Sequence, residues 1–366
     1  MLVIEQLHYA TTSRYNFPQT TPGEPELPER LIELSHNSMR NARGTNFLPY
    51  GTQSAEPFTE RPQEDEALSL NSEALSALLT PLKPIRDETP ITAIDVSSIR
   101  IGETETGVLC AVRGVIVQNE KHRYRYVRIG PFPFHITEEN KKEIFILPGQ
   151  ATPSGFGAVH SLLLEAQSHL CNVVERWIQM STAHSAMGNV ILWDGSLTAG
   201  TASSPANVVA QILGTARKNS NSVLSFAKGT SLRFLGRRIT DLVPNYESPC
   251  LFEVDDLPLQ TSKTLRQLGK VYVAKLADRG YPFRVDIDRA LAPESRIMAV
   301  QRLLGNELIF QGYPESLRLA HIFSTFTAND VMGIQRFVTE EYGLRIATRH
   351  SIRKTLFGPF GTGAED

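Results

Sequence analysis

Two stretches of sequence, ITAIDVSS at residues 91–98 and NVILWDGSL at residues 189–197, decide the fold predicted for this chain. Each is a short apolar run that leads into an aspartate, Asp95 in the first and Asp194 in the second. A carboxylate that follows buried strand residues is held near the edge of a sheet, where ligands commonly bind. An aspartate before glycine or serine is usually a turn residue, so one such motif is weak evidence for a ligand-binding site. Two such motifs are stronger evidence.

The residues around and between these stretches indicate a β-meander followed by a helix. Residues 91–101, 107–118 and 124–129 are rich in β-branched side chains and are separated by short polar turns, which predicts antiparallel strands. Apolar residues at helical spacing predict a helix over residues 155–180. The run at residues 189–193 is then a short strand that stops at Asp194.

The downstream sequence continues to mix the two kinds of element. Helices are expected over residues 205–216 and 294–304, from Pro314 onward and from an N-cap at Thr327 to about Tyr342. Strands are expected over residues 222–227, 271–277 and 283–287. The predicted fold class is therefore α/β, with a mixed sheet flanked by helices.

The first 90 residues differ from the rest, because they contain ten prolines among many polar residues. Proline at this density interrupts helices and sheet ladders, so we expect an irregular N-terminal arm or cap. Two helical pieces are plausible within it, at residues 26–41 and 64–79. The expected division is an arm or cap at 1–90, a main domain at 91–350 and a tail at 351–366.

Composition excludes several classes of protein. The formal charge of −2 provides no overall basic field, so a nucleic-acid partner would need local basic patches or metal ions. Three widely spaced cysteines fit neither a disulfide framework nor a zinc site. Without a signal peptide or an apolar run of membrane-spanning length, a cytoplasmic protein without a membrane partner is expected. The chain also lacks the sequence motifs of several enzyme classes. These are the phosphate-binding loop G-x-x-x-x-G-K-[ST], the zinc-binding motifs H-E-x-x-H and paired C-x-x-C, and the serine-hydrolase motif G-x-S-x-G.

The acidic residues suggest a metal site. Carboxylate oxygens suit Mg²⁺ and Mn²⁺, and a pair of such ions can activate water and stabilise the leaving oxygen in phosphodiester cleavage. The predicted helix between the two strands offers Glu165 and Glu175 as a further ligand. We favour Glu175, which lies near the end of the helix, although either glutamate can equally belong to a solvated helix face.

This order of elements resembles the ribonuclease H-like fold, in which a first strand carries Asp, two strands and an acidic helix follow, and a fourth strand brings another Asp. Together with downstream motifs, it resembles the NurA nuclease family. The family's second Asp-Gly-Ser-Leu is intact at residues 194–197, whereas its first Asp-Gly-Ser is replaced by Asp95-Val96-Ser97. Further matches are LSFAK at 224–228, VYVAK at 271–275 with FRVDI at 283–287, and GYPESLRLAH at 312–321. The resemblance covers roughly residues 90–350.

The resemblance implies that Asp95, Glu175 and Asp194 hold Mn²⁺ or Mg²⁺ and that Tyr313 and His321 complete the catalytic site. His321 would ligate the metal or move a proton. On its residue context alone, His321 is more often a core or capping histidine, and Tyr313 a packing residue. Asp286 is expected to pair with a neighbouring arginine rather than to join the site.

Basic residues provide candidate DNA contacts. Lys228 follows a strand, Arg233 and Arg237 lie in a second cluster, and Arg345, Arg349 and Arg353 would form one basic face if helical. Each group can track a DNA backbone or simply be solvated surface. The contacts expected on this basis are Lys228, Arg233, Arg237 and Arg349.

The resemblance implies a metal-dependent DNA nuclease, a 5′-to-3′ exonuclease with some single-strand endonuclease activity. It also implies a homodimer that works with a HerA-like hexameric ATPase in DNA end processing, repair or defence. The absence of an ATP-binding loop agrees with that division of labour. Two alternatives stay open: a catalytically inactive partner subunit that binds DNA or the motor, and a ribonuclease H-like enzyme acting on RNA–DNA hybrids or junctions.

Overall fold

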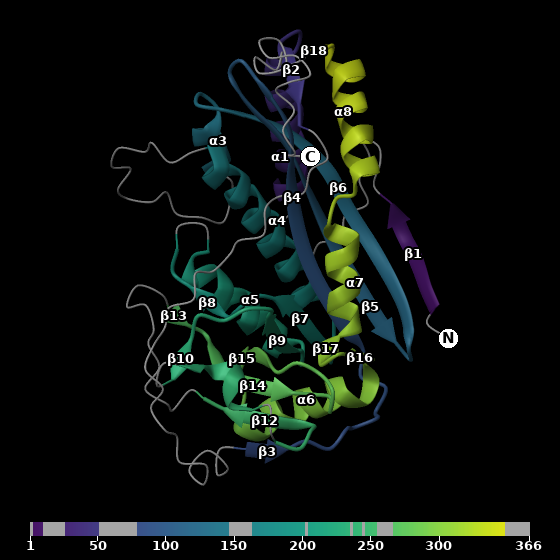
Figure 1. The fold of residues 1–366 in the computed structure, drawn as a ribbon, viewed down its shortest axis with the longest axis vertical. Coiled ribbons are helices and arrows are strands. Elements are labelled where there is room, and N and C mark those ends of the chain that lie inside the picture. The colour runs from purple at the N-terminus through teal and green to yellow at the C-terminus, as the bar shows by residue number, and fades with distance from the viewer. Residues whose placement is uncertain are drawn as a thin grey trace, which may run out of the picture.

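A mixed sheet of twelve strands runs through the molecule and is covered by helices on both faces (Figure 1). The computed structural model describes residues 3–9, 26–50, 79–145, 163–201, 204–234, 237–243, 246–254 and 266–347. The strand order along the main path is β1-β6-β5-β4-β7-β9-β15-β14-β12-β3, with β2 and β18 joined beside β4. This confirms the predicted α/β class.

The predicted meander forms the long arm of the sheet. It consists of β4 (Ile91–Thr104), β5 (Gly107–Glu120) and β6 (Arg123–Thr137), and each strand is antiparallel to the next. The strands are longer than the sequence pattern indicated. Partly buried polar residues continue β4 to Thr104, and a mostly buried stretch with Phe132, Phe134 and Ile136 continues β6 to Thr137. Side chains of a strand alternate between the two faces, so Ala93 and Ile94 enter different hydrophobic clusters.

The centre of the sheet has the predicted connectivity. β7 (Val190–Asp194) lies parallel to β4, with Ile94 opposite Trp193, and β9 (Ser222–Ala227) lies parallel to β7. The order β6-β5-β4-β7-β9 places β7, the strand that ends at Asp194, beside β4, the strand that carries Asp95. The direct consequence is that Asp95 and Asp194, 99 positions apart in the sequence, follow neighbouring residues of paired strands.

The remaining strands extend both edges of the sheet. On one side they are β15 (Phe283–Asp288), β14 (Gly269–Lys275), β12 (Cys250–Glu253) and β3 (Leu79–Pro81), and on the other β1 (Val3–Tyr9), β2 (Asn46–Pro49) and β18 (Arg345–Ile346). Three small pairs are β8 (Thr198–Ala199) with β13 (Arg266–Gln267), β10 (Arg233–Phe234) with β11 (Arg237–Arg238), and β16 (Ile309–Phe310) with β17 (Tyr313–Pro314).

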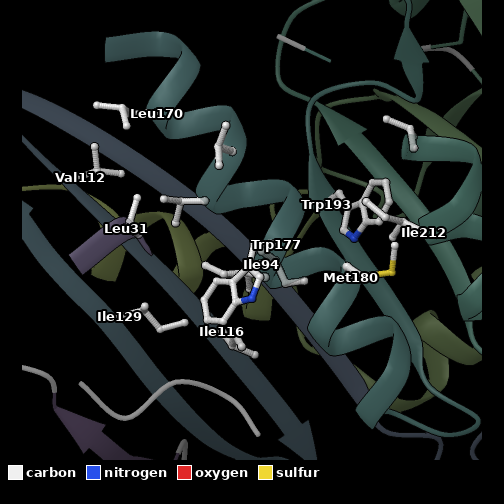
Figure 2. Packing of buried hydrophobic residues seen from close by; sticks show 14 of the residues in the cluster. Leu31, Ile94, Val112, Ile116, Ile129, Leu170, Trp177, Met180, Trp193 and Ile212 are labelled. Atoms are coloured by element: carbon white, nitrogen blue, oxygen red, sulfur yellow. The ribbon is translucent and has the colours of Figure 1, made fainter. Parts of the chain in front are cut away.

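One face of the sheet is covered by α1 (Glu26–Asn41), α3 (Lys141–Phe145), α4 (Leu163–Ser185) and α5 (Ala206–Lys218). Figure 2 shows how Trp177 of α4, Trp193 of β7 and Ile212 of α5 pack within this cluster. Each such side chain, when fully buried, contributes roughly 1.5–3 kcal/mol to folding. This packing fixes α4 against the strands that carry the two aspartates.

The opposite face is covered by α6 (Pro293–Asn306), α7 (Glu315–Ser324) and α8 (Ala328–Tyr342). A short 3-10 helix, η1 (Ile239–Leu242), packs against Phe252 and Val273, which alternate with the residues of β12 and β14 that face α6. α7 buries Leu317, Leu319 and Ala320 against residues of β4 and β5. By the alternation of the strand, Asp95 lies on the same side as Ala93, which is the side that α7 covers. Figure 1 shows α7 running along this part of the sheet.

Most predicted elements appear where the sequence placed them, including α1, α5, α6 and a capping box at Thr327. The idea of one helical basic face from Arg345 is wrong at its start, because Arg345 pairs with Asn46 in a parallel strand. Leu79 is likewise in a strand; the rest of the helix expected at 64–79 lies outside the described residues, as do residues 155–162 and 351–366.

The described parts of the first 90 residues join the main sheet or pack on it: β1 pairs with β6, β2 with β4 and β3 with β12. The division of the chain into an arm, a nuclease domain and a tail stays a prediction. Within the described residues, no helix is long and apolar enough to cross a membrane.

An ion pair between buried Arg113 and half-buried Asp330 joins the sheet to α8. Arg113 Nη2 lies 2.9 Å from Asp330 Oδ1, and Asp330 also accepts hydrogen bonds from the backbone and hydroxyl of Thr327. Burial alone would raise the pKa of Asp330, but these hydrogen bonds lower it from 3.8 to about 2. The depressed pKa means that this stabilisation is fully present above pH 3.8 and is lost as the pH falls towards 2.

We therefore expect Asp330→Asn to destabilise the protein most at pH 5 and progressively less at lower pH. The measurement is urea unfolding of both proteins between pH 5 and pH 2.5. Asp241→Asn, at an exposed position, is the matched control. A destabilisation by Asp330→Asn that is the same at every pH would contradict the assignment.

Candidate active site

Asp95, Asp194 and His321 come together from three elements that are distant in the sequence. Each offers one possible ligand atom, a carboxylate oxygen or an imidazole nitrogen, and these atoms all lie within 4.8 Å of one another. Asp95 belongs to β4, Asp194 ends β7 and His321 lies on α7. Two neighbouring strands and the helix that covers them therefore build the group.

The backbone after each aspartate explains why the two motifs differ. Gly195 has a φ of 100°, a conformation that L side chains rarely adopt, and its N–H donates to Phe226 O at 2.8 Å. By contrast, β4 runs through Val96 to Thr104 without a turn. The backbone therefore requires a glycine after Asp194 but not after Asp95. Val96 continues the strand and leaves the position of Asp95 unchanged.

Asp95 is held by α7 through two side chains. His321 Nδ1 lies 3.3 Å from Asp95 Oδ2, and the Ser324 hydroxyl donates to the same oxygen. The hydroxyl of Ser97 donates to the backbone oxygen of Ser324, which ties β4 to the end of α7 a second time. Sequence reasoning missed Ser324; its spacing of three residues from His321 on one helix was the available signal.

Asp194 is neutralised by a lysine. Lys228 Nζ lies 2.6 Å from Asp194 Oδ2, and both side chains are partly exposed. Lys228 directly follows β9, the strand parallel to β7, so the sheet itself brings the ammonium group to the aspartate. Of the four predicted DNA contacts, Lys228 lies at the site. Arg233 and Arg237 lie in the β10–β11 pair, and Arg349 is outside the described residues.

The loop after Asp194 is anchored by a buried carboxylate. Leu197 N–H donates to Asp286 Oδ2 at 2.9 Å, and Arg284 donates to both oxygens of Asp286 at 2.7 Å. Asp286 is fully buried, and Gln267 donates to it as well. The predicted pairing of Asp286 with an arginine is confirmed, and its contact with Leu197 shows that it positions the loop that begins at Asp194.

Glu175 of α4 is not one of the three residues whose ligand atoms converge, which are Asp95, Asp194 and His321. The Glu175 carboxylate accepts a hydrogen bond from Gln179 Nε2 at 2.8 Å. Burial raises the pKa of Glu175, and the charges of Asp95 and Asp194 raise it further, against the opposing effect of Arg176. These influences place Glu175 in the electric field of both aspartates. The side chain of Glu165, the other candidate, is outside the described residues.

Tyr313 closes the apolar side of the site. Its ring packs against Phe283 and Phe226, with centroids 5.1 Å and 5.9 Å away. The hydroxyl is buried and has no hydrogen-bond partner among the described residues. Burial raises the pKa of this hydroxyl, and the charges of Asp194 and Asp95 contribute to the rise. An unsatisfied buried hydroxyl costs about 1–3 kcal/mol, which favours a bound oxygen-bearing ligand or water at this position.

The donor set fits a divalent cation. Two carboxylates and one imidazole suit manganese, and the 4.8 Å span is comparable to the distance across the coordination shell of such an ion, about 4–5 Å. Like charges this close repel each other unless a cation lies between or beside them. At Asp194 the ammonium group of Lys228 already acts as such a cation.

Comparison with known proteins supports the fold. No protein-family model matches the sequence, and no curated protein sequence matches it either. Among solved structures, the NurA nuclease from Sulfolobus solfataricus aligns over 75% of this chain and 90% of its own, at 16% identity and a TM-score of 0.52. Similarity at this level shows that the two chains share a fold.

Two further structures align less closely. Another NurA structure covers 74% of this chain and 93% of its own, at 9% identity and a TM-score of 0.41. Endonuclease V from Bacillus subtilis covers 74% and 91%, at 12% identity and a TM-score of 0.35. Only the first of the three structures is similar enough to support an argument about fold, and the chemistry has to be argued from the side chains described above.

The raised pKa of Glu175 predicts that this residue destabilises the metal-free protein. Its ionised form is disfavoured by burial and by the two aspartates, and this penalty is complete once the pH exceeds the raised pKa. We expect Glu175→Gln to raise the melting temperature at neutral pH in a chelating buffer, because glutamine keeps the oxygen that accepts from Gln179. The exposed Glu139→Gln serves as the control. A lower melting temperature for Glu175→Gln would mean that the charge is stabilised by its surroundings.

Proposed function

We propose that this chain is a NurA-type deoxyribonuclease that hydrolyses phosphodiester bonds with the help of Mn²⁺ or Mg²⁺. The observation that carries the proposal is the convergence of Asp95, Asp194 and His321 from two strands and a helix. Carboxylates next to a partly exposed imidazole form a site that can bind a divalent cation and the phosphate that it polarises. The shared fold with a NurA nuclease is consistent with this chemistry.

In this proposal Asp95, Asp194 and His321 hold the metal, and Glu175 joins them as a ligand or as the acceptor of a proton from water. A divalent cation bound there would polarise the phosphate and lower the pKa of an attacking water. Ser324 keeps Asp95 oriented by donating to one of its oxygens. Asp286 does the same for the loop after Asp194 through Leu197.

Tyr313 and Lys228 would bind the phosphate. The Tyr313 hydroxyl, which has no partner among the described residues, would donate to a non-bridging phosphate oxygen. Lys228 would exchange its contact with Asp194 for the phosphate, to which it presents a compact positive charge. As the alternative to ligating the metal, His321, whose side chain is 52% exposed, would transfer a proton between water and the leaving oxygen.

The central prediction concerns Asp194→Asn, which removes a charge with little change of shape. Purified wild-type protein with Mn²⁺ should degrade linear DNA, and the variant should lose at least about a hundredfold in rate, since a metal ligand is removed. Asp241→Asn, at an exposed position, should cleave like the wild type. Thermal unfolding and circular dichroism establish whether each variant is folded.

The outcomes separate the proposal from its alternatives. Full activity of Asp194→Asn would overturn the site. A wild-type protein that binds DNA but cleaves none, even with a HerA-type ATPase present, would be the inactive partner subunit. Preferential cleavage of the RNA strand of an RNA–DNA hybrid would favour the ribonuclease H-like alternative.

The finer features follow from the sequence resemblance and are part of this proposal. They are 5′-to-3′ exonuclease activity with single-strand endonuclease activity, assembly as a homodimer, and work with a HerA-like hexameric ATPase in end processing, repair or defence. DNA labelled at the 5′ or the 3′ end tests polarity, because release of the 5′ label first is expected. Sedimentation tests for the dimer, and stimulation of degradation by the ATPase with ATP tests for the motor. Arg233, Arg237 and Arg349 would contact the DNA backbone away from the site.

A further inference from the structure

The hairpin that carries Tyr313 also carries an exposed aromatic side chain. Phe310 of β16 is directly opposite Tyr313 of β17, and the turn between them contains Gln311 and Gly312, both with positive φ. Directly opposed residues of an antiparallel pair project from the same face, with Cβ atoms about 4.5–5.5 Å apart. Tyr313 is buried beside the carboxylates, whereas Phe310 is 50% exposed. The Phe310 ring is therefore at the rim of the candidate active site.

The neighbour of this ring is an arginine that is already paired. The guanidinium carbon of Arg318 lies 5.2 Å from the centre of the Phe310 ring. Glu315, which is almost fully buried, accepts from Arg318 Nε at 2.7 Å and from Nη2 at 2.6 Å. This double contact fixes the plane of the guanidinium group and largely neutralises its charge. Arg318 thus provides a rigid planar group next to an aromatic ring rather than a free cation.

The pair lies one helical turn from the catalytic histidine of the proposed function. Arg318 and His321 are three residues apart on α7, which places both on one side of the helix and separates them by about 4.5 Å along its axis. Consecutive stacked nucleotides of one strand are separated by about 3.4 Å. A strand whose phosphate lies at His321 can therefore place an adjacent base at Phe310.

Exposed aromatic side chains gather at this hairpin. The described residues have three large aromatic side chains that are exposed, Tyr281, Phe310 and Phe337. Tyr281 is 66% exposed, and its backbone N–H donates to Gln311 O at 2.9 Å, so two of the three are at the hairpin. The Gly312 Cα has no room for a side chain, because a Cβ would lie 2.4 Å from Tyr281 O. The two segments are thus held firmly against each other.

From these observations we propose a nucleobase-binding subsite, in which an unpaired base of the substrate strand stacks on Phe310 beside the guanidinium plane of Arg318. The inference rests on the proposed nuclease function and names the part of the substrate that the site recognises. Every base has an aromatic face, so such a subsite binds a strand without preference for sequence. A base in a duplex is already stacked on both faces, so the subsite favours a single strand or a frayed end.

The test compares Phe310→Ala with Phe337→Ala, since both phenylalanines are 50% exposed and Phe337 lies on α8, away from the hairpin. Binding of a fluorescent single-stranded oligonucleotide is measured by anisotropy in a chelating buffer, where no divalent cation is present to support cleavage. We expect Phe310→Ala to weaken binding about tenfold, as for the loss of one base–aromatic contact, and Phe337→Ala to have no effect. Phe310→Trp should bind at least as tightly as the wild type.

A second readout separates stacking from a structural role. A set of oligonucleotides, each with one abasic nucleotide, is bound to the wild type and to Phe310→Ala. At the position that occupies the subsite, removing the base should weaken wild-type binding and should have no further effect on the variant. In a strand with a 2-aminopurine at that position, its fluorescence should be quenched by the wild type and not by Phe310→Ala.

The subsite is refuted if Phe310→Ala binds every strand as Phe337→Ala does, or if no abasic position couples to Phe310. These results are independent of cleavage. A wild-type protein that binds strands through Phe310 but does not cut DNA with Mn²⁺ would refute the proposed activity and keep the subsite. A wild-type protein that cuts DNA but binds strands without any contribution from Phe310 would refute the subsite and keep the proposed activity.

Discussion

The parallel pairing of β4 with β7 is the constraint on which the rest of the site depends. It brings Asp95 and Asp194 to neighbouring positions, and two carboxylates at that distance repel each other. The surrounding residues offset this repulsion in different ways. Lys228 supplies a positive charge to Asp194, and His321 and Ser324 supply hydrogen bonds to Asp95. The pKa of Glu175 on α4 is raised mainly by burial, and the charges of the two aspartates add to the rise.

The two faces of the sheet contribute differently to this arrangement. The face that carries α4 is apolar at the centre, where Trp177 and Trp193 pack, and it fixes the strands in place (Figure 2). The face that carries α7 brings polar groups, because α7 buries Leu317 and Ala320 while His321 remains at the edge. The reactive groups thus lie beside packed core on both faces, since Tyr313 belongs to the apolar cluster under α7 and Glu175 lies on α4.

Sequence patterns predicted the strands and helices of this region, and the family resemblance added the expectation that the two aspartates share a site. The apolar runs before Asp95 and Asp194 predict strands, and the structure shows that these two strands pair in parallel. The long-range contacts could not be predicted in this way. The spacing of Ser324 from His321 on one helix shows that the two share a face, but not that this face meets Asp95. Nothing local marks the contact of Leu197 with Asp286, because it depends on how elements far apart in the chain pack. The strand at Arg345 was missed for the same reason, since its partner is Asn46.

The segment from Phe310 to Ser324 joins a two-residue turn directly to a helix, with Pro314 at the junction. Five of its residues face the site or its rim, at positions 310, 313, 318, 321 and 324. A helix advances about 100° per residue, so one inserted or deleted residue within this segment would turn every later group away from its partner. The segment can therefore vary in composition at its exposed positions while its length stays fixed.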